Sequence, residues 1–306
     1  MSWRDRARGA VERLLVISGL PSATIARLRG DTLILAYHNI IPDGELPAGD
    51  RSLHLPRRAF VAHLDALVET HNIVSLDDVV KHVPAGSSRP RAVITFDDAY
   101  RGAVTVGVAE LAARSLPATI FVSPAFVGGG TFWWDVLTPP FADSLDPAFR
   151  SRALREWRGI DAVVRAGALE CGLVVQPVPD YVACASENEL LHAAAHDGIS
   201  FAAHTWSHPN LALLEDAELR AELVRPLSWL RERFGRVISA LSYPYGLSTT
   251  VTEHAAAQAG YHAAFRISGG WLRGVAQSSY ALPRLNVPAG VSPHGFLLRA
   301  SGVLGG

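Results

Sequence analysis

Short apolar runs recur along this chain, and each ends at turn or polar residues before a segment of helical period begins. Eight of these runs predict β-strands, namely TLILAYH, IVSL, AVITF, ATIFV, ISFAAH, ISALSY, HAAF and LPRLNV. Strands that alternate with helices pair in parallel, so seven or eight units favour an α/β fold, a closed or nearly closed (β/α) barrel. In such a barrel the active-site groups lie at the carboxyl ends of the strands.

Two helices between the predicted strands are well marked. Residues 57–70 place their apolar side chains on one helical face. Residues 215–235 predict a second helix, interrupted at Pro226 because proline lacks the N–H donor that a helix interior needs.

The alternation is broken between about residues 128 and 189, where FWWD is followed by a charged helical stretch over residues 150–167. This segment predicts an insertion on the active face of the barrel. We expect the barrel to span residues 31–306, preceded by a helical extension over residues 1–30.

The extension has an arginine-rich start, but Asp5 and Glu12 interrupt it and the apolar part is short, so a cleaved signal is not favoured. A helix here either packs in the ordinary way or rests on a membrane surface. The apolar residues that favour either placement share one side: Val11, Leu14 and Leu15.

Charge and cysteine content narrow the classes of function and compartment. The 28 basic and 29 acidic residues nearly cancel, so a nucleic-acid partner is not expected. Two cysteines are too few for a disulfide framework. We therefore expect a cytoplasmic protein or one at the cytoplasmic side of a membrane, with export left open and the oligomeric state undetermined.

Two predicted strands end in groups that bind metal ions. Asp97 and Asp98 follow AVITF, and this pair by itself is better explained as a turn or a helix cap. His204 ends ISFAAH and His208 lies four residues on, a spacing that lets two imidazoles reach one ion. One carboxylate with two imidazoles is a common open catalytic metal site.

Spacing alone is weak support, because His192 and His196 have the same spacing on a charged helical segment. Only the pair at the strand end is placed for chemistry.

After a third strand comes YPYG, where a backbone N–H near Tyr245 either serves as an oxyanion donor or belongs to a plain turn.

Together TFDD, HTWSHP and YPYG, in this order, resemble the motifs of the polysaccharide deacetylase family, the NodB-homology carbohydrate esterases, over residues 33–287. The resemblance implies a distorted (β/α) barrel with a divalent metal ion, usually zinc, that lets water attack the acetamide of an N-acetylated sugar. It also implies the roles of five residues: Asp98, His204 and His208 as metal ligands, Asp97 as general base, and the Tyr245 backbone as oxyanion donor. LAYHNI and FWWD look like a branch of the family common in bacterial surface-glycan pathways.

The sequence departs from the family pattern at three places. Ala99 replaces the glycine of TFDDG and should therefore avoid a positive φ. Ser242 replaces the arginine that opens the third motif, and Arg284 stands near the expected general-acid histidine. Arginine keeps its proton, so we expect Arg284 to pair with Asp97 instead.

The general acid must then come from elsewhere, and His38 at the end of the first strand is the candidate. The alternative is that His38 only packs or holds a loop. Four aromatic residues are candidates for substrate contact: Trp133, Trp134, Trp206 and Tyr243. The alternative for the two adjacent tryptophans is that they anchor the insertion.

Two other classes of function compete with a deacetylase. The first is a catalytically retired barrel that acts as a carbohydrate-binding or regulatory protein. Loss of a metal ligand would mark such a barrel, yet all three candidates are present. A glycoside hydrolase needs carboxylates about 5 to 10 Å apart, which neighbouring aspartates with a histidine pair fit less well. A serine hydrolase lacks support because no G-x-S-x-G occurs.

Overall fold

The computed structural model describes residues 3–84, 88–274 and 278–304. A strand is present at each of the eight predicted positions, although the second and the last are only two residues long. These strands are β1 (Thr32–Tyr37), β4 (Asn72–Ile73), β5 (Arg91–Phe96), β6 (Ala118–Val122), β7 (Ile199–Ala203), β8 (Val237–Ser242), β9 (Ala263–Phe265) and β11 (Leu285–Asn286).

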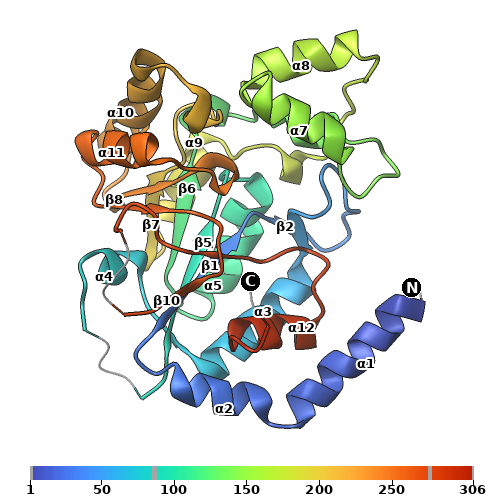
Figure 1. Ribbon diagram of the computed structural model, residues 1–306, viewed down its shortest axis with the longest axis vertical. Coiled ribbons are helices and arrows are strands. Elements are labelled where there is room, and N and C mark those ends of the chain that lie inside the picture. Colours follow the sequence, from blue (N-terminus) through green and yellow to red (C-terminus); the bar gives the residue numbers. More distant parts are fainter. Residues whose placement is uncertain (1–2, 85–87, 275–277, 305–306) are drawn as a thin grey trace.

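The main sheet curls into a barrel whose strands are parallel, in the order β1-β5-β6-β7-β8-β9 (Figure 1). The segment that carries β11 links the two ends, because Leu282 bridges Phe265 of β9 while β11 pairs with β1. The predicted α/β barrel is thus confirmed. Strands β1 and β6 are buried along their whole length, as their unbroken apolar runs require.

Three short strands were not predicted. β10 (Trp271–Leu272) adds to the main sheet as an antiparallel neighbour of β1. β2 (Asn39–Ile41) and β3 (His54–Pro56) pair with each other in a second, two-stranded sheet. Two or three residues carry too little hydrophobic pattern to be recognised as strands.

Helices alternate with strands from β3 to β6 and from β7 to β9, and further helices lie at the termini and between β6 and β7. The helices of the described residues are α1 (Trp3–Ile17), α2 (Leu20–Arg27), α3 (Arg57–Thr70), α4 (Leu76–Val80), α5 (Val108–Ala112), α6 (Trp133–Val136), α7 (Pro147–Arg155), α8 (Asp161–Glu170), α9 (Glu187–Ala194), α10 (Asp216–Arg233), α11 (Thr250–Gln258) and α12 (Pro293–Ala300). Within residues 3–84, 88–274 and 278–304, no helix has both the length and the apolar run that crossing a bilayer requires.

Two helix predictions need correction. α10 continues through Pro226, which is buried on its inner face, so tertiary packing outweighs the lost backbone hydrogen bond. The charged stretch 150–167 is not one helix, because Arg158 and Gly159 adopt φ values of 53° and 65° between α7 and α8. A left-handed pair of residues ends one helix and redirects the chain.

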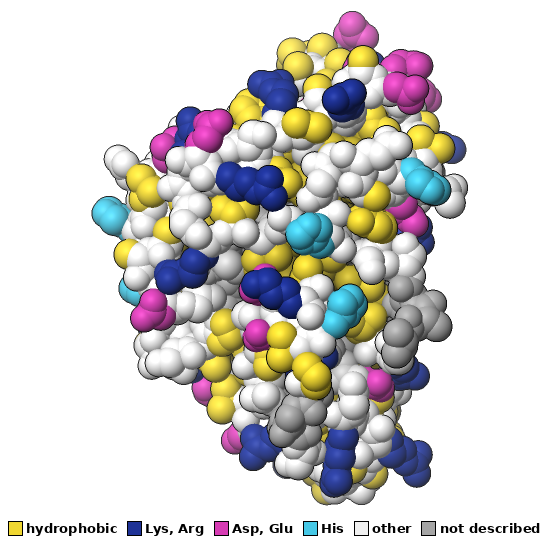
Figure 2. Space-filling view, turned by 90° about the vertical axis from the view of Figure 1, so that its left-hand side faces the viewer, with side chains coloured by type: hydrophobic (Ala, Val, Ile, Leu, Met, Phe, Trp, Pro, Cys, Tyr) yellow, Lys and Arg dark blue, Asp and Glu magenta, His cyan; other side chains and the backbone are white. Residues whose placement is uncertain are grey.

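The predicted insertion lies between β6 and β7 and contains α6, α7, α8 and the start of α9. Its helices α7 and α8 lie at the opposite end of the molecule from α1 and α2 (Figure 1). The N-terminal helix α1 packs against α12, where Ser292 donates a hydrogen bond to Glu12. On the face shown in Figure 2, basic and acidic side chains are interspersed, so the near balance of charge is also a mixture in space.

Candidate active site

The carboxyl ends of the barrel strands bring the sequence motifs together around one cavity. Asp97 and Asp98 follow β5, His204 follows β7, Tyr245 follows β8 and His38 follows β1. All five line this catalytic cavity of about 290 Å³, whose complete lining is His38, Leu53, Asp97, Asp98, Trp134, Arg150, Leu154, His204, His208, Tyr245, Leu247, Ile267 and Asn286.

Asp98, His204 and His208 form a compact buried triplet. The Nε2 atoms of His204 and His208 lie 3.1 Å apart. Oδ1 of Asp98 lies 3.5 Å from Nε2 of His204 and 3.4 Å from Nε2 of His208. Nδ1 of His204 lies 2.8 Å from the carbonyl oxygen of Ser242. Because a carbonyl only accepts, Nδ1 carries the proton and the Nε2 lone pair faces the other two side chains.

The protonation states follow from burial. Burial raises the pKa of the Asp98 carboxyl well above its usual range, and repulsion by Asp97 adds to the effect. Burial also lowers the pKa of His204, against the opposing attraction of Asp97, and holds that of His208 well below its usual range. Without a cation, Asp98 therefore favours its protonated form, while both imidazoles are neutral, the form in which histidine binds metals.

This triplet fits a divalent cation. Ligand atoms bound at about 2.0 to 2.2 Å in tetrahedral or octahedral geometry lie roughly 3 to 3.5 Å apart, as these three do. Oδ1 of Asp98 is buried and has no hydrogen-bond donor within the described ranges. A bare carboxylate oxygen beside two imidazole lone pairs is a donor set for a divalent cation.

Asp97 has a different environment, because Arg284 binds both of its carboxylate oxygens at 2.7 Å. The predicted contact between these two residues is thus confirmed. Arg284 is fully buried and also donates to Ser242 Oγ at 2.7 Å and Thr95 Oγ1 at 3.1 Å. Burial alone would raise the pKa of Asp97, but Arg284, and then His204, hold it well below its usual range. Asp97 therefore stays ionised.

The site stores backbone strain, and Ala99 contributes to it. Ala99 adopts φ 50°, so the expectation that it avoids a positive φ is wrong. Of the eight non-glycine residues with positive φ in the described chain, five lie in the three motifs, at Asp98, Ala99, Thr205, His208 and Tyr245. Each costs about 1 to 2 kcal/mol, and such residues cluster where a chain must aim side chains at a site. Ala99 is fully buried, so packing holds it in place.

His38 and Tyr245 line the cavity as the sequence predicts, while their roles stay predictions. Burial lowers the pKa of His38 to about 4, although the attraction of Asp97 opposes the shift. His38 is therefore neutral at neutral pH. The ring of Tyr245 packs edge-on against His208, with 4.7 Å between ring centroids.

The aromatic candidates for substrate contact divide. Trp134 lines the cavity, but Trp133 is 1% exposed and donates to the Tyr245 hydroxyl at 3.2 Å, the position of an anchor. Trp206 lies outside the lining, with the Arg225 guanidinium stacked 3.8 Å from its ring centroid.

Tyr243 requires a correction. It is fully buried and donates to the Tyr280 carbonyl at 3.0 Å, so direct contact with substrate does not fit this structure. Neighbouring strand residues point to opposite faces, which directs Tyr243 away from the side that Ser242 occupies next to Asp97.

Two polar residues of the cavity were missed. Asn286 lies two positions after Arg284 beside β1, and the period of two along a strand was a usable signal, because it places both on one face. Arg150 of α7 donates to the buried carboxylate of Asp50 at 2.9 Å, a contact across 100 residues that no local pattern indicates.

The FWWD motif ends in a buried carboxylate that ties the insertion to the barrel. Asp135 accepts from the Tyr100 hydroxyl at 2.6 Å, from the Asp50 backbone N–H at 3.0 Å and from His54 Nε2 at 2.9 Å. Tyr100 in turn accepts from the Trp134 indole N–H at 2.9 Å. This network fixes Trp134 at the cavity wall.

Similar structures share this architecture. The Streptococcus pyogenes deacetylase PplD in complex with acetate has a TM-score of 0.60 and 17% identity, over 88% of this chain and 97% of that one. IcaB from Ammonifex degensii has a TM-score of 0.59 and 16% sequence identity, over 90% of this chain and 98% of that one. A de-N-acetylase from Aggregatibacter actinomycetemcomitans has a TM-score of 0.59 and 16% sequence identity, over 86% of this chain and 97% of that one. At these identities the likeness concerns the fold.

Among curated proteins, none matches this sequence. A family model does match: residues 85–264, more than half of the chain, fit the sequence profile of the family described as polysaccharide deacetylase. That range contains all three motifs, from TFDD to YPYG. With the barrel and the grouped motifs, the match shows that this chain belongs to the polysaccharide deacetylase family, the carbohydrate deacetylases among the hydrolases.

Proposed function

We propose that this protein removes the N-acetyl group from an N-acetylated sugar by metal-assisted hydrolysis, with Asp98, His204 and His208 as the ligands. The observation that carries the proposal is the juxtaposition of two unlike carboxylates. Asp97 is neutralised by Arg284, while Asp98 has a bare oxygen beside two imidazoles. A metal hydrolase needs both kinds at one place.

The division of labour follows from the environments of the residues. A bound cation supplies Lewis-acid polarisation and lowers the pKa of water. Asp97, oriented by Arg284, accepts a proton from the attacking water. Its low pKa makes it a weak base, so it serves only toward water that is already acidified. The backbone N–H of Tyr245 is our candidate donor to the developing oxyanion.

His38 is our candidate for protonating the departing amine. Because its pKa is about 4, it does not carry a proton at rest near neutral pH, so it must receive one during turnover. Replacing His38 by glutamine, which cannot relay a proton in this way, should lower kcat about 100-fold and leave metal content unchanged. Acetate-release kinetics measure the effect. A His38→Gln enzyme with full kcat would restrict His38 to packing.

The function is tested by acetate release from a panel of N-acetylated monosaccharides, oligomers and polymers. We expect release that stops on chelation and returns with zinc or another divalent ion. His204→Ala should abolish both stoichiometric metal binding in a calorimetric titration and acetate release. His192→Ala is the matched control, because His192 is exposed on α9 and has the same spacing to a second histidine. Metal-loaded protein that releases no acetate from any sugar would contradict the proposal and favour a carbohydrate-binding role.

We also propose that α1 rests on a membrane surface. Its side toward α12 holds buried Glu12, whereas Trp3, Leu14 and Ile17 are 81%, 67% and 69% exposed. Positions 3, 14 and 17 share one helical face, and exposed Arg6 and Arg13 lie along one edge of it. An apolar face bordered by arginines complements a bilayer with anionic lipids.

Vesicle sedimentation tests this placement. The protein should pellet with vesicles that contain phosphatidylserine, and Leu14→Glu should reduce the bound fraction about tenfold or more. Val251→Glu is the control, because Val251 is similarly exposed, at 63%, on α11. Equal pelleting of the two variants would contradict the proposal that this face of α1 contacts the membrane.

A further inference from the structure

Two further cavities adjoin the catalytic cavity through shared wall residues. The first, of about 230 Å³, shares Ile267 and Asn286 with the catalytic cavity. The second, of about 690 Å³, shares Pro288 and Arg299 with the first. Together they connect the metal-site candidates with the groove between α1, α12 and the loop before β3. Arg299 is the charged residue common to the two outer cavities.

We propose that these two cavities are a subsite for an anionic group, a phosphate or a carboxylate, carried by the carbohydrate substrate next to the acetylated sugar. The inference rests on the proposed function and names the substrate class of that same site. Arg299 is the principal recognition residue.

The first support is an imbalance of charge in the larger cavity. Its lining contains Arg8, Arg51 and Arg299 against one acidic residue, Asp143, which is almost fully exposed and 3.5 Å from Arg51. Arg8 pairs with Glu12 at 2.9 Å. Arg299 has no acidic partner or hydrogen-bond acceptor for its side chain in the described part of the chain.

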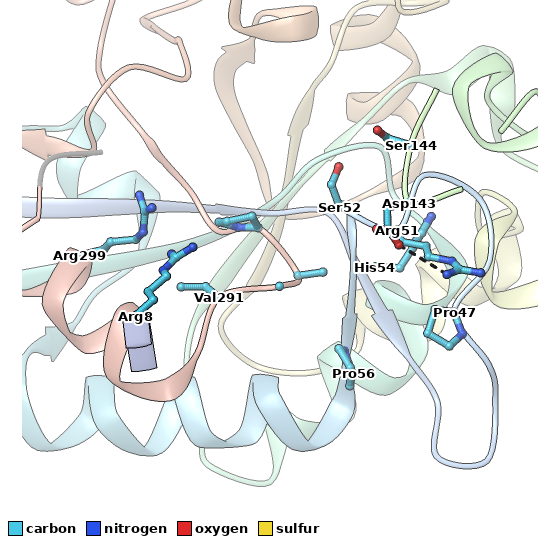
Figure 3. A pocket seen from close by; sticks show the side chains of 13 residues that line it. Arg8, Pro47, Arg51, Ser52, His54, Pro56, Asp143, Ser144, Val291 and Arg299 are labelled. Atoms are coloured by element: carbon cyan, nitrogen blue, oxygen red, sulfur yellow. Dashed lines mark hydrogen bonds and ion pairs between the residues drawn. The ribbon is translucent and has the colours of Figure 1, made fainter. Parts of the chain in front are cut away.

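Figure 3 shows how these charges are placed. Arg299 of α12 and Arg8 of α1 lie on one side of the cavity, while Arg51 and Asp143 lie on the other, where a dashed line joins them. The guanidinium that lacks a partner is thus next to a second arginine. An arginine side chain without a carboxylate partner, next to a second arginine, favours a bound anion.

The second support is independent of net charge. Eight buried side-chain polar atoms lack a hydrogen-bond partner among the described residues, and three of them belong to residues that line the smaller cavity, Arg284, Asn286 and Arg299. These three atoms are Nε of Arg284, Oδ1 of Asn286 and Nε of Arg299. Arg284 binds Asp97 through its two terminal nitrogens, so its Nε–H remains available. Leaving such groups unsatisfied is costly, and two N–H donors are what an anion or its bound water would satisfy.

The test compares neutral and anionic substrates of otherwise similar structure. N-acetylglucosamine oligomers are the neutral substrates, N-acetylglucosamine 1-phosphate carries a phosphate, and an N-acetylglucosamine–glucuronate disaccharide carries a carboxylate. In Arg299→Gln the ratio of kcat/KM for the anionic to the neutral substrate should fall about tenfold, and Arg299→Lys should restore part of it. Arg220→Gln is the control, since exposed Arg220 lines a groove between α10 and α11 and its loss changes net charge equally.

A titration with glycerol 3-phosphate and with glucuronate tests the subsite without turnover. The metal-site residues are intact in both variants, so weaker binding by Arg299→Gln than by Arg220→Gln isolates the subsite, and the probe with the larger difference identifies the group. Equal binding by the two variants, or an unchanged kcat/KM ratio, would overturn the inference and leave water as the occupant. Absence of acetate release from every sugar would instead refute the proposed function, and the titration alone would then decide the subsite.

Discussion

Asp97→Asn is expected to lower kcat for deacetylation by a factor of about 10² to 10⁴ and to leave the bound metal in place. Asparagine has the same shape as aspartate but cannot accept a proton from water. The Asp97 carboxylate is also outside the triplet, and its Oδ2 atom lies 4.0 Å from Nε2 of His204. Metal content and turnover should therefore respond independently.

The measurement combines acetate-release kinetics with metal analysis of the purified variant. Asp197→Asn is the control, because Asp197 is fully exposed, pairs with Arg236 at 3.4 Å and lies outside the lining of the catalytic cavity. Asp98→Asn should show the complementary result, with weakened metal binding. An Asp97→Asn enzyme that turns over normally, or that loses its metal, would reverse the roles assigned to the two aspartates.

Replacing Arg284 by methionine should destabilise the fold by about 3 to 5 kcal/mol. Arg284 is fully buried, and the change leaves the Asp97 carboxylate buried and without its cation. Part of the loss should be recovered in the double variant Asp97→Asn/Arg284→Met, in which no buried charge remains to be neutralised. Urea unfolding of the wild type, both single variants and the double variant gives the coupling energy. A purely additive double variant would show that the pair is not coupled.

The same pair predicts a pH dependence whose sign follows from the lowered pKa of Asp97. A carboxyl group with a lowered pKa in the folded state stabilises the fold above its unfolded pKa, about 3.9, and this stabilisation is lost as pH falls through the folded pKa. In Arg284→Met the pKa of Asp97 should rise, because burial then acts unopposed. The acid limb of kcat/KM should move to higher pH accordingly. An unchanged acid limb would assign it to another group.

Local patterns were sufficient where one strand or one motif carried the information. Short, mainly apolar runs located all eight strands, most clearly β1 and β6, because strands buried on both faces cannot be polar. The strand-end positions of Asp97, Asp98, His204 and His208 predicted their grouping, since parallel strands share one edge. The missing family histidine and arginine together predicted the contact between Arg284 and Asp97.

Local patterns failed where distant packing decides the outcome. α10 passes through Pro226 because a buried face offsets a lost hydrogen bond. Ala99 accepts φ 50° because its fully buried position allows no relaxed alternative. Whether a tryptophan anchors or lines a cavity depends on what surrounds it, so adjacent Trp133 and Trp134 have different positions.

The sequence by itself determined the barrel, the order of its strands along the chain and the chemical groups at the strand ends, because these depend on periodicity and residue type. Only the tertiary structure decided how those groups differ. It gave Asp97 a buried arginine, left Asp98 with a bare oxygen, and placed Arg150 and Arg299 beside the catalytic cavity and its extension. Such differences arise from burial and from contacts between residues far apart in the chain, and no local pattern encodes them.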